Sequence, residues 1–186
     1  LISRGGGVLE EKELIKDLKD GKEEAYYKLV NIYGNKLLRT CFLMLKDEKE
    51  AEDIVQDTFI KVFKYINGFK GNSSLYTWVY KIAQNIIKDK CKNDISTIPY
   101  EDYYTSEDNI EEIIINNNNK RILKEKLKEM GFIYKQVLVL FYFNDFSIKE
   151  ISEILDEKEG TIKSKLSRGR KLLKTSLLEG GKLNEL

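Results

Sequence analysis

Apolar residues recur every three or four positions along most of this chain, which is the spacing that places them on one face of an α-helix. The clearest example lies in residues 51–92, where two such patterns are separated by a short polar turn. The first pattern consists of Ala51, Ile54, Val55, Phe59, Val62, Phe63 and Ile66, and the second consists of Leu75, Trp78, Val79, Ile82, Ala83 and Ile86. We therefore expect two amphipathic helices joined by a glycine- and serine-containing loop at residues 68–74.

The same periodicity predicts helices on both sides of this central block. They are expected over residues 8–20, 23–45, 119–130, 133–143, 148–155 and 159–178. The only proline is Pro99, which favours long helices over a loop-rich β fold. Ser147 and Glu150 have the spacing of a capping box, in which each side chain accepts a hydrogen bond from the other residue's backbone N–H. The predicted fold class is all-α.

Helical periodicity fails between residues 93 and 119, and the charge changes there as well. This segment contains seven acidic residues and no lysine or arginine, whereas residues 158–174 carry seven basic residues against Glu159 alone. Such an asymmetry favours a flexible acidic linker between two small helical domains that face different partners. The predicted organisation is, in chain order, an expression remnant, an N-terminal domain, the linker and a C-terminal domain, over residues 1–7, 8–94, 95–118 and 119–186.

The sequence offers little for catalysis or for binding a cofactor. It contains no histidine, no cysteine cluster and no glycine-rich phosphate loop, so we expect no metal, no cofactor and no small-molecule substrate. Cys41 and Cys91 lie far apart within helical patterns, and we expect both thiols to be free in a reducing cytoplasm. No stretch is long and apolar enough to span a membrane, so we expect no membrane insertion and a cytoplasmic location.

The last two predicted helices are joined only by Asp156, Glu157 and Lys158. Two helices separated by so tight a turn, the second of them basic, indicate a helix-turn-helix that binds DNA. Lysine and arginine along one face neutralise phosphates, and they can also read the edges of guanine in the major groove. Because a basic helix alone is usually only a solvated face, the turn and the capping box carry much of this interpretation.

Residues 51–92 closely resemble the second conserved region of bacterial sigma factors of the extracytoplasmic-function (ECF) group, in the sigma-70 family. The resemblance rests on the run AEDIVQDTF, the loop sequence FKGNSS, the pair Thr77-Trp78, and Ile82-Ala83 followed by Asn85. The segment SIKEISEILDEKEGTIKSKLSRGRKLLK resembles the fourth conserved region of the same family. The similar segments cover about residues 10–92 and 119–178, which is most of the chain.

This resemblance implies which surfaces meet which partners. The patch that docks on the clamp of core RNA polymerase would consist of Glu52, Asp53, Gln56 and Asp57. The surface that captures an unpaired base and contacts the minus-ten promoter element would consist of Phe69, Lys70, Asn72, Ser73, Ser74, Tyr80, Lys81, Gln84, Asn85 and Lys88. At the minus-thirty-five element, the groove-facing residues would be Lys163, Ser164, Ser167 and Arg168, with Thr161, Lys165, Arg170 and Lys171 near phosphates.

The resemblance implies an ECF-type sigma factor, which we expect to bind core polymerase, to recognise both promoter elements, to assist promoter melting and to have no catalytic centre. A membrane-anchored anti-sigma protein is a further candidate partner. The acidic linker is either a solvated spacer or a segment that enters a channel of the polymerase. Two alternatives remain: a stand-alone helix-turn-helix regulator, which leaves residues 51–92 unexplained, and a helical hydrolase that uses the Asp53 and Asp57 carboxylates.

The sequence departs from the family pattern in the C-terminal domain. In the family, the turn that corresponds to residues 156–158 usually carries a glycine, an apolar residue and a capping serine, whereas this chain has Asp156, Glu157 and Lys158. We therefore expect Asp156 to adopt the left-handed conformation, and we expect the helix after Lys158 to start without a side-chain cap. Gly169 stands where the family generally has alanine, and residues 130–132 replace the usual Leu-Pro-Pro.

Overall fold

The computed structural model describes residues 8–45, 47–91 and 120–179, which form helices joined by short turns, with no strand among them. The all-α fold predicted from the periodicity is confirmed. The chain divides near residue 90 into two compact units, which are described separately below. The acidic linker predicted for residues 95–118 lies outside the described residues.

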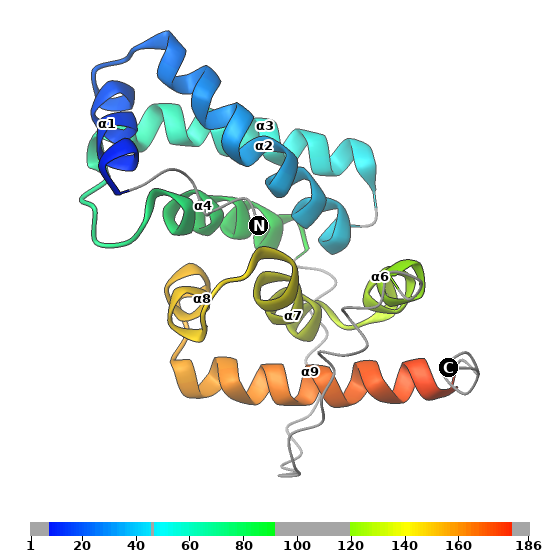
Figure 1. The fold of residues 1–186 in the computed structure, drawn as a ribbon. Helices are drawn as coiled ribbons and strands as arrows, with labels where there is room; N and C mark the ends of the chain where they lie inside the picture. The colour runs from blue at the N-terminus through cyan, green and yellow to red at the C-terminus, as the bar shows by residue number, and fades with distance from the viewer. Residues whose placement is uncertain (1–7, 46, 92–119, 180–186) are drawn as a thin grey trace. The chain divides into compact units, whose positions relative to one another are not determined.

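The first unit is built on two long antiparallel helices. It contains α1 (Val8–Lys19), α2 (Glu23–Leu45), α3 (Glu48–Tyr65), the 3-10 turn η1 (Ile66–Gly68) and α4 (Leu75–Lys90) (Figure 1). The Tyr26 ring near the start of α2 lies 5.0 Å from the Phe63 ring near the end of α3, so these helices run in opposite directions. Helix α1 packs against α2 and η1. The core of this unit includes the fully buried side chains of Leu18, Leu29, Leu37, Ile54, Ile66, Leu75, Tyr80 and Ile87.

Helix α3 begins before the apolar pattern that starts at Ala51. Asp47 is extended, with φ −117° and ψ 126°, and its carboxylate accepts a hydrogen bond of 2.8 Å from the backbone N–H of Glu50. This is the arrangement of an N-cap residue, which satisfies a donor that the helix itself leaves free. The helix therefore starts at Glu48.

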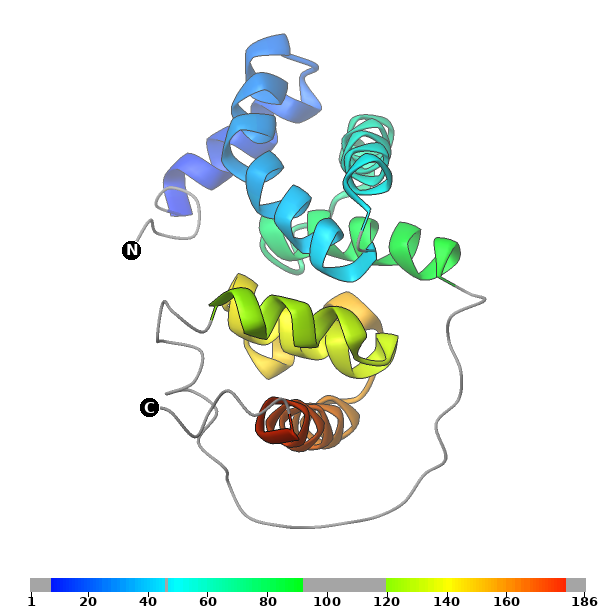
Figure 2. The same ribbon diagram turned by 90° about the vertical axis from the view of Figure 1, so that its right-hand side faces the viewer.

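The second unit contains α6 (Lys120–Glu129), α7 (Phe132–Asn144), α8 (Ile148–Leu155) and α9 (Glu159–Glu179). Figure 2 looks nearly along the axis of α9, against which α6 and α7 pack. The capping box at the start of α8 is confirmed. The N–H of Ser147 donates to Glu150 Oε2 over 2.8 Å, and the N–H of Glu150 donates to Ser147 Oγ over 3.3 Å.

Aspartates end two helices of this unit. Asp145 follows α7 and Asp156 follows α8, and both adopt the left-handed conformation, with φ of 56° and 57°. Aspartate tolerates this conformation better than most residues, although glycine is the usual choice. The expectation for Asp156 is thus confirmed, and the chain turns into α9 without a glycine.

Gly169 lies on the buried stripe of α9, between Leu166 and Leu173. A Cβ atom at this position would lie 3.2 Å from the Leu138 side chain of α7, which is closer than most such contacts. The glycine therefore lets the backbone of α9 approach α7 more closely than an alanine would allow without movement of Leu138.

Both cysteines are buried free thiols. Burial raises the pKa of the Cys41 thiol to about 12, which leaves it protonated at neutral pH. In the described part of the chain, no helix combines the length and the apolar character needed to cross a membrane.

Candidate polymerase and DNA interfaces

One face of α3 is acidic and exposed. Glu52, Asp53, Gln56 and Asp57, the residues expected to meet the polymerase, all present exposed side chains there, and we call them the acidic face. The opposite side of the helix is buried through Ala51, Ile54, Thr58 and Val62. The structure thus brings the four residues together, as their spacing predicted. Among the described residues, no three His, Cys, Asp or Glu side chains are grouped so that they could hold a metal ion.

The acidic face continues along α3 into exposed apolar residues. Ile60 and Phe63 follow Gln56 by four and seven residues, and their exposed fractions are 44% and 62%. Residues with this spacing lie on one side of a helix. Phe63 belongs to the apolar pattern that predicted this helix, yet its side chain is exposed, although its ring does contact Tyr26. Apolar residues occur on both sides of α3, and their spacing alone does not say which side another helix covers.

The loop before α4 presents small polar groups at the surface. Lys70 and Asn72 are exposed and Ser73 is partly exposed. Gly71 has φ +74°, a conformation that glycine adopts without strain. Ser74 is engaged differently, because its Oγ accepts a hydrogen bond of 3.0 Å from an N–H in the first turn of α4. Ser74 therefore caps the helix that follows the loop.

Phe69 does not take the base-stacking role expected of it. Its side chain is 5% exposed, and its ring lies 5.1 Å from the ring of Trp78. A ring packed in the core of the unit is not available to stack on an unpaired base. An aromatic residue beside a polar loop can either contact a base or anchor the loop in the core, and the sequence contains no signal that separates these two roles.

Both ends of this loop are attached to α1. Lys19 Nζ donates a hydrogen bond of 2.8 Å to the carbonyl oxygen of Phe69, and Glu11 Oε1 accepts one of 2.6 Å from the N–H of Leu75. Nothing in the sequence marks Glu11 and Lys19 as part of this site, because they lie 64 and 50 residues from their partners and no helical pattern connects them.

Helix α4 divides the residues expected at the minus-ten element into two groups. Asn85 and Lys88 are exposed, and Lys81 is partly exposed. Tyr80 and Gln84 are buried, with exposed fractions of 0% and 2%, so the expectation that they face DNA is corrected. Tyrosine and glutamine suit either a core or a surface, so their residue types alone did not place them on α4.

The position of Tyr80 has a clear physical cause. Its ring lies 4.6 Å from that of Tyr76, and its hydroxyl oxygen lies 3.4 Å from the Thr40 hydroxyl oxygen on α2. Burial in this cluster raises the pKa of Tyr80 above its ordinary value, which keeps the phenol neutral. The side chain therefore joins α4 to α2.

The residues expected at the minus-thirty-five element surround the buried stripe of α9. Thr161, Lys163, Ser167 and Lys171 are exposed, and Ser164, Lys165, Arg168 and Arg170 are partly exposed. Arg170 is engaged within its own unit, since its guanidinium carbon lies 5.8 Å from the centre of the Phe141 ring. The exposed Lys163 and Lys171 place positive charge on the surface of α9.

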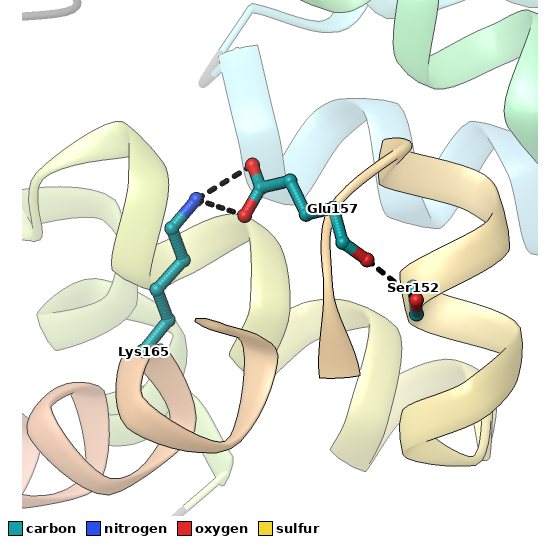
Figure 3. A network of polar contacts seen from close by, with 3 residues as sticks. All are labelled: Ser152, Glu157 and Lys165. Atoms are coloured by element: carbon teal, nitrogen blue, oxygen red, sulfur yellow. Dashed lines mark hydrogen bonds and ion pairs between the residues drawn. The ribbon is translucent and has the colours of Figure 1, made fainter. Parts of the chain in front are cut away.

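Lys165 is ion-paired rather than free for a phosphate. Its Nζ lies 2.7 and 2.6 Å from the two carboxylate oxygens of Glu157, in the turn before α9 (Figure 3). The carbonyl oxygen of Glu157 in turn accepts a hydrogen bond from the Ser152 hydroxyl on α8. Glu157 thus connects the turn to both helices of the helix-turn-helix.

Two family models match the chain. The model for sigma-70 region 2 matches residues 29–94, and the model for sigma-70, region 4, matches residues 120–173. The first match contains α3 and α4 with the loop between them, and the second contains the helix-turn-helix. Helix α1 precedes both matches.

Curated relatives span nearly the whole chain. The ECF RNA polymerase sigma factor SigW of Bacillus subtilis is 30% identical over 184 residues, which cover 89% of this chain and 96% of that protein. The ECF RNA polymerase sigma-E factor of Haemophilus influenzae is 27% identical over 184 residues, with 91% of this chain and 96% of that protein covered.

Two solved structures share the fold. CnrH, in complex with the cytosolic domain of CnrY, is matched with a TM-score of 0.68 and 18% identity, over 91% of this chain and 97% of that chain. The sigma factor RpoE of Bartonella quintana, in complex with the anti-sigma factor NepR, is matched with a TM-score of 0.61 and 22% identity, over 86% and 97%. At these identities the similarity establishes the fold alone.

Proposed function

This chain belongs to the extracytoplasmic-function group of sigma-70-family RNA polymerase sigma factors, and on that premise we propose how its two units divide the work of initiation. It binds core RNA polymerase and promoter DNA and directs the start of transcription, whereas RNA synthesis itself belongs to the polymerase. The match over residues 29–94 accounts for the block that a stand-alone helix-turn-helix regulator leaves unexplained. The chain works in the cytoplasm, where polymerase and chromosome meet.

In this proposal the acidic face docks on the polymerase clamp. What supports it is the exposure of all four side chains on one side of α3. Acidic groups attract a basic partner surface and orient it, while the adjoining Ile60 and Phe63 offer apolar area that a partner could bury. The docking surface would therefore run from Glu52 to Phe63.

The loop and α4 contact the minus-ten element. Removing a base from its stack costs a few kcal/mol, which contacts to the captured base must offset. Asn72 and Ser73 can donate to and accept from a base edge, and Lys70 suits the adjoining phosphate. The observation that carries this proposal is that Lys70 and Asn72 are exposed, and Ser73 partly exposed, on a loop whose two ends are hydrogen-bonded to α1. Phe69 and Ser74 support the loop, and Lys81, Asn85 and Lys88 continue its surface along α4.

The helix-turn-helix reads the minus-thirty-five element. Lys163, Ser164, Ser167 and Arg168 face the major groove, and Thr161, Lys165, Arg170 and Lys171 lie near phosphates. Lys165 reaches a phosphate only by leaving Glu157, so its contribution to DNA binding is smaller than that of an unpaired lysine.

A regulatory protein partner is also part of the proposal. CnrH and the Bartonella quintana RpoE share this fold, and the latter is bound to an anti-sigma factor. We therefore expect an anti-sigma protein for this chain as well, and such a protein would compete with polymerase or DNA for the surfaces described above.

The test is promoter opening by polymerase holoenzyme reconstituted with this chain. A promoter is first selected by in vitro transcription of genomic fragments, and unpaired thymines are then detected with permanganate. The variant Asn72→Ala with Ser73→Ala should bind polymerase and form closed complexes nearly as wild type does. It should open the duplex promoter more slowly, and a template already melted at the minus-ten element should restore part of the activity.

Asn67→Ala is a matched control, because Asn67 is an exposed polar residue in η1 just before the loop. This control should open the promoter at the wild-type rate. Opening by the Asn72 and Ser73 variant at that same rate would show that the loop is only a turn.

A further inference from the structure

Helix α1 contacts both ends of the loop at residues 69–74, the loop proposed to capture an unpaired base. Glu11 holds the N–H of Leu75 at the end of the loop, and Lys19 holds the carbonyl oxygen of Phe69 at its start. Lys19 follows Glu11 by eight positions of helix, which corresponds to about 12 Å along the axis. A single rigid element therefore contacts both boundaries of the exposed segment.

The position of α1 is itself fixed by packing. Leu14 and Leu18, which lie between Glu11 and Lys19 on the helix, are 6% and 1% exposed. The helix also packs on η1, which leads directly into the loop. Because its apolar side is buried, α1 can hold the two loop ends at a constant separation.

The Glu11 contact is favourable in electrostatic terms. The first N–H groups of a helix have no partner within the helix, and the positive end of the helix dipole attracts a carboxylate. Ser74 satisfies one of these donors at the start of α4, and Glu11 satisfies the N–H of Leu75. The start of α4 is thus capped once by its own loop and once by α1.

We propose that α1 positions the loop for base capture and that Glu11 and Lys19 are the positioning residues through which it acts. This inference rests on the role proposed for the loop at residues 69–74. A loop that is already ordered loses less conformational freedom when it captures a base, so ordering favours the captured state. Loss of either anchor should slow promoter opening while polymerase docking continues.

The experiment measures open-complex formation by the reconstituted holoenzyme on a duplex promoter. Glu11→Ala and Lys19→Met should each slow opening about five- to tenfold, the loss that follows from one capping or charge-assisted bond. Retention on polymerase should stay at the wild-type level. Glu11→Gln and Lys19→Arg keep an acceptor and a donor at these positions, and should recover most of the rate. Glu13→Ala, an exposed residue of the same helix, is the matched control and should open at the wild-type rate.

A positioning role also predicts that anchor and loop act as one unit. Glu11→Ala combined with Asn72→Ala and Ser73→Ala should open no more slowly than the loop variant alone, because a loop without its polar groups gains nothing from being held. If the factors by which the two changes slow opening multiply in the combined variant, Glu11 has a separate, merely structural role and the proposal is overturned.

Two further outcomes separate this inference from the function on which it rests. If the Asn72 and Ser73 variant is slow but Glu11→Ala and Lys19→Met behave like Glu13→Ala, the positioning role is wrong and the role of the loop stands. If the loop variant opens at the wild-type rate, the loop assignment fails and the positioning role fails with it. Thermal unfolding identifies variants that do not fold. Glu11→Gln and Glu11→Ala then remain the decisive pair, and they are compared by how strongly the rate of promoter opening depends on the base at the minus-ten element.

Discussion

The two units hold their DNA-binding segments in different ways. In the first unit, hydrogen bonds tie the loop at residues 69–74 to α1 across 50 and 64 residues of sequence. In the second unit, the helix-turn-helix is held by partners three, five and eight residues apart, namely Ser147 with Glu150, Ser152 with Glu157, and Glu157 with Lys165. Local bonds reinforce a turn that the chain already favours, whereas distant ones form only when the whole unit folds. The loop therefore depends on the fold of its unit, whereas the turn of the helix-turn-helix is held by local bonds while α9 itself packs on α6 and α7.

The two units also differ in the charge that they present. The acidic face of α3 suits a basic protein surface, and the basic side chains of α9 suit phosphates. If this division is correct, a change in one surface should weaken binding to one partner and leave binding to the other unchanged.

The largest effect is expected from reversing charge on the acidic face. Asp53→Lys with Asp57→Lys places two positive charges where a basic clamp would dock, and like charges at an interface cost several kcal/mol. Polymerase binding, measured by pull-down or by titration, should fall about a hundredfold or more while circular dichroism shows an intact helical fold. Binding of duplex DNA by the free chain should not decrease.

A matched control keeps the same change in net charge. Glu13→Lys with Asp20→Lys alters two exposed acids outside α3. This control should bind polymerase as wild type does. Equal losses in the two variants would mean that net charge, and not the acidic face, governs docking.

A moderate effect is expected on the other unit. Arg168→Ala should weaken binding to promoters that depend on the minus-thirty-five element by about 1–3 kcal/mol if the guanidinium reads a base edge. Polymerase retention should be unchanged. Arg168→Lys keeps the charge but loses the bidentate geometry, so it should restore little selectivity. A loss of affinity that is the same for every DNA sequence, with a smaller salt slope, would assign Arg168 to phosphate contact instead.

The smallest effect concerns the ion pair in the turn. Glu157→Gln should release Lys165 to a phosphate, so that duplex affinity rises and the slope of log K against log salt steepens by up to about 0.9. Glu159→Gln removes the same charge from an exposed neighbour that no observed bond links to Lys165. If the two variants show identical slopes, the ion pair does not restrain Lys165.

Helix positions followed from the sequence because helical periodicity is a local property. The helix expected over residues 23–45 is α2 with the same bounds, and the capping box of Ser147 and Glu150 forms as its spacing predicted. The grouping of the acidic face on one side of α3 also followed from the sequence, since charged residues at helical spacing share one side of whichever helix they belong to. The meaning of that face, and the assignment of promoter elements, came from family resemblance and not from periodicity.

The contacts that organise the site could not be predicted in this way. The Phe69 ring packs on Trp78, and Tyr80 lies against Tyr76 and Thr40, whereas an aromatic residue is equally suited to a core or to a base. The Glu157–Lys165 pair spans a turn, so no spacing rule for a single helix applies to it. Glu11 and Lys19 find their partners through tertiary packing, which leaves no periodic signal in the sequence.

Because Cys41 is buried, its reactivity reports local unfolding of the first unit. With a pKa of about 12, only about one Cys41 thiol in 10⁵ is a thiolate at pH 7, and thiolate is the form that alkylating reagents attack. Because the side chain is fully buried in α2, modification must wait for fluctuations that uncover it. The labelling rate of Cys41, followed separately from that of Cys91, therefore reports excursions of the first unit from its native packing, as amide exchange does.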